Sequence, residues 1–221
     1  MMKIRGPLAT LGAVAVLGTG IWLVNMSHEG ATGGAAPVQP AVESPVTAAP
    51  APTAETTSSN PVPAFPAKAA YVGKIPTRDG SLTLDITVAG DKAIAYACDG
   101  SNVEAWLSGR ADNGALTAAS KNGSRRLEGR LQGDGVVGTL WIDQQSWEFT
   151  AAAVQPPAGL YVYEDAGVRA TWIIDGNGAV TGVQREPDGS TSPAPELSLA
   201  GIAVIDDRRI TAIRVEGDDD I

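Results

Sequence analysis

The chain has 221 residues, a formal net charge of −9, 43% apolar residues and one cysteine. The acidic balance argues against nucleic acid as a partner and against adhesion of the folded domain to anionic lipid, because both carry negative charge. A single cysteine excludes an intrachain disulfide framework and a multi-cysteine zinc site. With 26 glycines, 15 prolines and few helical runs, the composition favours β structure with many turns.

The first predicted element is a membrane span at residues 7–24, a run of about 18 uncharged residues that nearly matches a hydrocarbon core. Lys3 and Arg5 precede it and favour a cytoplasmic N-terminus. The run exceeds the apolar region of a usual signal peptide, and no good cleavage site follows closely. We expect residues 1–29 to form a cytoplasmic tip and an uncleaved signal anchor, with the remainder extracytoplasmic. Secretion after signal cleavage is the alternative.

Residues 30–69 are rich in Pro, Ala, Ser and Thr and contain one aromatic residue, Phe65. Such a segment buries too little apolar surface to offset its ordering entropy, so it predicts a disordered linker. A linker of this length lifts the following domain from the membrane surface into an envelope layer.

Residues 70–216 predict an all-β domain. Turn residues recur about every ten positions, the segments between them are rich in β-branched and aromatic residues, and none shows helical periodicity. Short connections imply antiparallel neighbours and hence a meander. Closure as a barrel and folding as a two-sheet sandwich both remain open, because each removes exposed edges. Two prolines at residues 155–159 mark a potential seam, and residues 217–221 form an acidic tail.

Residues 92–109, KAIAYACDGSNVEAWLSG, predict a hairpin around the Asp99-Gly100 turn. Cys98 alternates in phase with apolar strand residues, which favours a small buried side chain, while an intermolecular disulfide is the alternative. The neighbouring acids Asp99 and Glu104 would raise the pKa of the thiol and weaken it as a nucleophile.

The motifs CDG at residues 98–100, EAWL at 104–107 and PAGLY at 157–161 resemble those of exported, single-anchor actinobacterial proteins of unknown function. The resemblance implies an N-terminal membrane helix, a Pro/Ala-rich spacer and a small β domain. It implies no activity, cofactor or catalytic residue.

The only histidine, His28, lies outside the predicted β domain. His-dependent triads and His-based zinc sites are therefore not expected, and we predict no catalytic residue, metal site or cofactor. We expect the chain not to be an enzyme. A hydrolase that uses paired carboxylates is the less favoured alternative.

Two tryptophans fall on the nominally polar side of their strands. In VEAWLSG, Trp106 shares a face with Glu104, opposite the apolar residues, and in TLWID the same alternation isolates Trp141. Trp106, Glu104 and Trp141 are therefore the candidates for a ligand or partner surface. Cover of both rings by a second sheet is the favoured alternative.

Together these features predict a membrane-tethered extracytoplasmic binding or interaction module of the cell envelope. Its partners would be the cytoplasmic membrane, through residues 7–24, and an envelope protein, glycan or lipid. A structural or assembly component of an envelope complex is the alternative.

Overall fold

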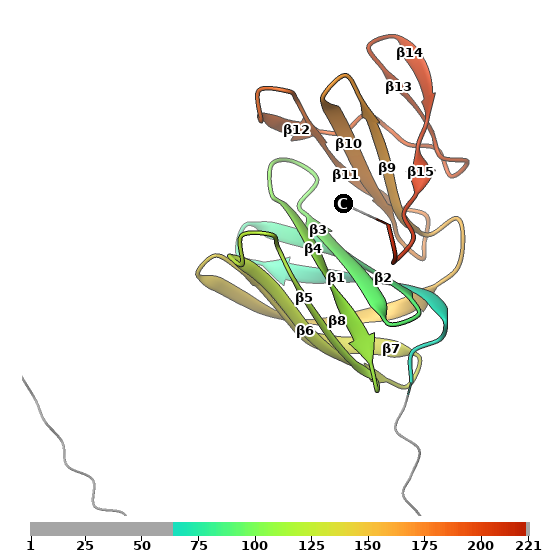
Figure 1. The fold of residues 1–221 in the computed structure, drawn as a ribbon. Coiled ribbons are helices and arrows are strands. Elements are labelled where there is room, and N and C mark those ends of the chain that lie inside the picture. Colours follow the sequence, from blue (N-terminus) through green and yellow to red (C-terminus); the bar gives the residue numbers. More distant parts are fainter. Residues whose placement is uncertain (1–63, 220–221) are drawn as a thin grey trace, which may run out of the picture. The chain divides into compact units, whose positions relative to one another are not determined.

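The computed structural model describes residues 64–219, and this part of the chain is all-β (Figure 1). The predicted all-β antiparallel class is confirmed. The predicted membrane span at 7–24 and nearly all of the predicted linker lie outside the described residues. Within residues 64–219 we find no helix with the length and apolar character needed to span a bilayer.

The first eight strands form a closed antiparallel barrel in sequence order, and β8 pairs back onto β1. Of the two arrangements left open by the sequence, this part of the chain takes the barrel. Each strand follows the previous one through a short turn, because Gly, Asn and Asp at the turns tolerate positive φ, as at Asn113 and Asp143. The strands are β1 (Lys68–Thr77), β2 (Gly80–Ala89), β3 (Lys92–Cys98), β4 (Glu104–Asp112), β5 (Ala115–Ala119), β6 (Arg125–Gln132), β7 (Gly135–Ile142) and β8 (Gln145–Val154).

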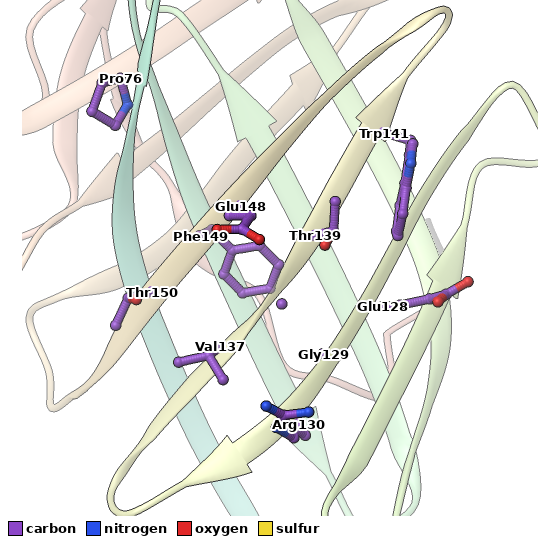
Figure 2. A pocket seen from close by; sticks show the side chains of 11 residues that line it. Pro76, Glu128, Gly129, Arg130, Val137, Thr139, Trp141, Glu148, Phe149 and Thr150 are labelled. Atoms are coloured by element: carbon purple, nitrogen blue, oxygen red, sulfur yellow. The ribbon is translucent and has the colours of Figure 1, made fainter.

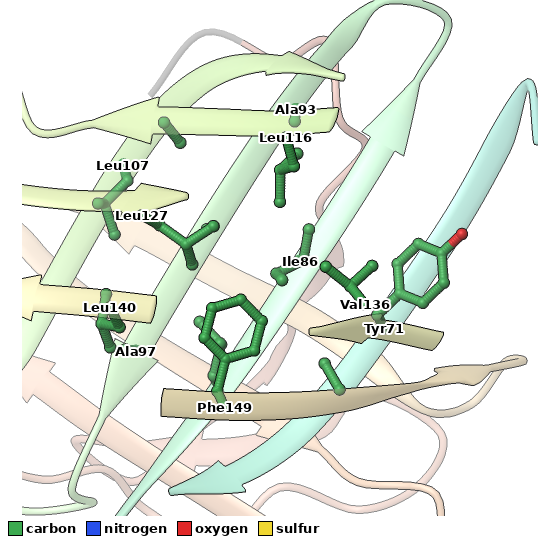
Figure 3. Close-up of a cluster of buried hydrophobic side chains, with 14 of the residues drawn as sticks. Tyr71, Ile86, Ala93, Ala97, Leu107, Leu116, Leu127, Val136, Leu140 and Phe149 are labelled. Carbon is green, nitrogen blue, oxygen red and sulfur yellow. The ribbon is translucent and has the colours of Figure 1, made fainter. Parts of the chain in front are cut away.

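The barrel interior is filled by one continuous cluster of buried apolar side chains (Figure 3). Alternate residues of each strand supply it, as the two-residue period of a strand requires. Small residues allow strands to approach closely: a β-carbon at Gly109 or Gly138 would overlap the backbone of the neighbouring strand. The largest fully buried members include Tyr71, Ile75, Leu84, Ile86, Leu107, Leu116, Leu127 and Leu140.

A second sheet of five strands, here called the C-terminal sheet, follows the barrel. It has its own core around Trp172, whose Nε1 donates to the carbonyl oxygen of Pro195 at 2.8 Å. A separate hairpin, β13–β14, contributes to this core. The strands are β9 (Gly159–Asp165), β10 (Val168–Ile174), β11 (Val180–Arg185), β12 (Thr191–Pro193), β13 (Ile202–Ile205), β14 (Arg208–Thr211) and β15 (Ile213–Arg214), and the sheet order is β12-β11-β10-β9-β15. Residues 155–159, marked above as a potential seam, connect the barrel to this sheet.

The outer side of strands β1 to β4 packs against the C-terminal sheet, and we call it the covered face. A third apolar cluster joins the two, with Ile94, Tyr96 and Cys98 from the barrel and Ile173 and Val183 from the sheet. Strand β3 is therefore buried on both sides, since its alanines face the barrel interior. This explains why KAIAYAC lacks the polar alternation of a half-exposed strand.

The ordered region begins earlier than the sequence predicts. The linker was expected to extend to residue 69, yet β1 begins at Lys68, and the Phe65 ring packs edge-to-face on Tyr71 with centroids 6.1 Å apart. At the other end, Gly217 is buried against β2, and Lys68 forms an ion pair with Glu216 at 3.0 Å. The first residues of the predicted acidic tail thus continue the fold.

Candidate functional site

Glu104, a predicted surface residue, lies on the covered face and is only 4% exposed. Its Oε2 accepts hydrogen bonds from Nε and Nη2 of Arg185 on β11, at 2.9 and 2.7 Å. Its Oε1 accepts from Trp106 Nε1 at 3.2 Å and from the Tyr96 hydroxyl at 3.3 Å. Both carboxylate oxygens are therefore fully engaged within the protein. The ion pair joins the barrel to the C-terminal sheet.

Trp106 is half-buried at the same contact. Its ring lies 4.6 Å from that of Tyr96, and the guanidinium of Arg169 on β10 lies 5.1 Å from the ring centroid. The sequence left two alternatives for this tryptophan, a free ligand surface and cover by a second sheet. The C-terminal sheet covers it. Glu104 and Trp106 thus act between two parts of the fold and do not present a free surface.

Cys98 is a free, fully buried thiol on the covered face. Burial is the main cause that raises the pKa of the thiol to about 12, with smaller contributions from the carboxylates of Asp99 and Glu104 and against hydrogen bonds with Gly100 and Tyr96. The thiol is therefore protonated at neutral pH and is a weak nucleophile.

Asp85 is a buried acid that the sequence analysis missed. It lies opposite Tyr96 in the β2–β3 register and is fully buried on the covered face. The Thr87 hydroxyl donates to Oδ1 at 2.8 Å, while Oδ2 has no hydrogen-bond partner among the described residues. Burial raises the pKa of this carboxyl to about 7, against the smaller lowering effects of Thr87 and Arg214. In the segment LTLDITV, residues 82–88, the alternating polar residues predict a solvent-exposed face. Nothing in that segment indicates that a second sheet covers it.

Trp141, the third predicted residue, lies far from this contact in the register, on the outer side of strands β6 to β8. This side, here called the open face, carries a groove of about 740 Å³ (Figure 2). Trp141 stands on one side of the groove, half-buried, with the Arg126 guanidinium 4.1 Å from its ring centroid. The other polar groups in the groove are the side chains of Glu128, Arg130, Thr139, Glu148 and Thr150.

The two glutamates of the open face do not form an acid pair. Thr139 on β7 lies between them in the register, opposite Glu128 on one side and Glu148 on the other. Figure 2 shows the Glu128 side chain directed away from Glu148. Both side chains are exposed.

A larger cavity, of about 1160 Å³, lies at one end of the barrel. The β1–β2, β3–β4 and β7–β8 connections meet there, and we call this cavity the mouth. Its lining includes Arg125 at the start of β6, which no feature of the sequence singled out. The residue directly follows a polar turn, a position that predicts an exposed surface arginine.

Among residues 64–219, no three His, Cys, Asp or Glu side chains come close enough to hold a metal ion. Comparison of the chain with family models, with curated proteins and with solved structures gave no match.

Proposed function

We propose that this chain is a membrane-tethered, extracytoplasmic binding module of the cell envelope whose open face binds a carbohydrate chain. The observation that carries the proposal is the position of Trp141 in a groove on the side of the barrel that the C-terminal sheet leaves uncovered. The predicted span and linker support the location, because they would hold this groove at a distance from the membrane.

Of a protein, a glycan and a lipid as ligand, the chemistry of the groove favours the glycan. An aromatic ring offers an apolar face to the C–H side of a sugar, and nearby carboxylates, guanidinium and hydroxyls can pair with its hydroxyl groups. Glu128, Arg130 and Glu148 provide such groups around Trp141. A lipid tail would need a continuous apolar channel. The centre of a protein interface is usually depleted of charged residues, unlike this groove.

An assembly role is the second candidate, and one observation favours it. Leu199, Val204 and Ile213, in the C-terminal part of the chain, are 52%, 56% and 71% exposed. Contact with another protein would remove these apolar side chains from water. Co-purification of a stoichiometric envelope protein that depends on these residues, and not on Trp141, would support this role.

Affinity electrophoresis of the full chain through gels that contain neutral or acidic polysaccharides tests the carbohydrate proposal. We expect at least one polysaccharide to retard the chain. Trp141→Ala should remove the retardation, because it removes the aromatic ring on which the sugar packs. Lys121→Ala, an exposed change outside the groove, is the matched control. If a panel of both kinds gives no retardation, or if Trp141→Ala migrates like the wild type in every gel, the proposal is wrong.

A further inference from the structure

The mouth of the barrel combines an apolar floor with a polar rim. Leu82 and Ile142 are buried at its base, and Trp147 is half-buried and packs against the barrel core. Around this floor the cavity is lined by the polar side chains of Thr77, Ser81, Ser101, Asn102, Gln144 and Ser146. Small-molecule sites combine apolar surface with placed polar groups, and barrel mouths are among their common positions. In this cavity most of the lining residues are polar.

Arg125 and Arg185 are the two half-buried arginines that line this cavity, and they differ in their partners. Nη1 of Arg125 donates to the backbone carbonyl of Glu104, and its Nε is buried without a hydrogen-bond partner. Among residues 64–219, the guanidinium makes no ion pair with a carboxylate. A partly desolvated charge without a counter-charge is unfavourable, so the site favours an incoming anion.

The nearest acids of the mouth are already engaged. Oδ1 of Asp99 accepts the backbone amides of Ser101, Asn102 and Val103, at 2.8 to 2.9 Å. The Glu104 carboxylate is bound by Arg185, whose Nη1 also donates to the carbonyl oxygen of Gly189. All three guanidinium nitrogens of Arg185 thus donate to groups within the protein, whereas only Nη1 of Arg125 does. Asp79, Asp143 and the cation Arg78 are exposed at the rim, and the two acids disfavour ligands with several negative charges.

From this arrangement we infer that the mouth is a second binding site, for a small organic molecule with an apolar body and a single anionic group. The body packs on Trp147 and the buried floor, and the anion pairs with Arg125, whose planar guanidinium suits a carboxylate. This site shares no lining residue with the groove around Trp141, so the two assignments are independent.

Two probes with one ring system test the inference: 2-naphthoate, which carries a carboxylate, and the neutral 2-naphthalenemethanol. Each is titrated calorimetrically into the full chain in non-ionic detergent, and the heat of blank micelles is subtracted. We expect naphthoate to bind at least about tenfold more tightly than the alcohol, as one charge-assisted hydrogen-bonded pair supplies. Arg125→Gln should remove this preference, and Trp147→Ala should weaken both probes.

Arg126→Gln is the matched control, because it removes the same charge from the next residue of the same strand. Arg126 stacks on Trp141 on the open face and does not line the mouth, so both affinities should stay unchanged. If Arg125→Gln does not fold, Arg125→Lys replaces it and should weaken naphthoate alone, since an ammonium cannot make the bidentate contact. The inference is overturned if neither probe binds, if the preference for naphthoate survives in the Arg125 variant, or if the Arg126 control loses it equally. None of these outcomes bears on the polysaccharide test.

Discussion

The covered face and the open face are the two outer sides of one barrel, and each carries a tryptophan with an arginine over its ring. On the covered face Arg169 lies 5.1 Å from the Trp106 ring, and on the open face Arg126 lies 4.1 Å from the Trp141 ring. The Arg126 side chain is 55% exposed and that of Arg169 is 30% exposed. The same kind of arginine–tryptophan contact therefore occurs in two environments. The covered pair stabilises the contact with the C-terminal sheet, while the open pair is the one that we propose contacts a ligand.

The largest difference between the faces should appear when the buried ion pair is broken. Arg185→Ala leaves the Glu104 carboxylate, 4% exposed, without its counter-charge. Loss of one partner of a fully buried pair typically costs about 3–5 kcal/mol. Because the Arg185 side chain is 42% exposed, we expect the free energy of unfolding to decrease by an amount toward the lower end of that range. Urea denaturation at pH 7 measures it.

Arg110→Ala provides the matched control for that experiment. Arg110 pairs with Asp91 where both side chains are exposed, at 73% and 61%. Exposed pairs contribute about 0–1 kcal/mol, so this variant should unfold nearly like the wild type. Equal losses in the two variants would contradict the assignment of Glu104 and Arg185 to a buried contact.

The covered face should also make stability depend on pH through Asp85. Burial raises the pKa of its carboxyl from 3.8 to about 7, so the folded protein retains a proton that the unfolded chain releases. Stability from this group is fully present below about pH 4 and declines as the pH rises to about 7, by an amount on the order of 4 kcal/mol. The charged neighbour that opposes the shift is Arg214, and the hydroxyl donor is Thr87.

Asp85→Asn removes the titrating group and keeps an acceptor for Thr87. We expect the free energy of unfolding of this variant to lose the decline between pH 4 and 7 and to exceed that of the wild type above pH 7. Asp175, which forms an ion pair with Lys74, has a lowered pKa and acts with the opposite sign only as the pH falls to 4 and below. Parallel pH profiles for wild type and variant would show that Asp85 does not titrate in this window.

The sequence was sufficient for the class of fold because its information is local. Turn residues at regular spacing and strand-period alternation predict an antiparallel meander, and Trp106, Glu104 and Trp141 lie on the outer side of the barrel, opposite the apolar residues of their strands. The same local pattern cannot reveal which outer positions another sheet covers. Asp85, Arg125 and Arg185 acquire their roles only from residues distant in the sequence. The sequence therefore allowed a covering sheet without showing which residues it contacts, and it did not indicate the mouth.

The smallest expected effect belongs to the open face. Trp141→Ala removes a half-exposed ring and a cation–π contact that is worth about 0.5–1 kcal/mol at exposed sites, so we expect the free energy of unfolding to fall by about 1 kcal/mol or less. Trp106→Ala should cost about 2–3 kcal/mol, because it also removes the hydrogen bond to the buried Glu104 and the contact with Tyr96. Thermal and urea unfolding of the two variants give the comparison. If the Trp141 variant proved as unstable as the Trp106 variant, Trp141 would have a structural role, and this would argue against the groove as a binding site.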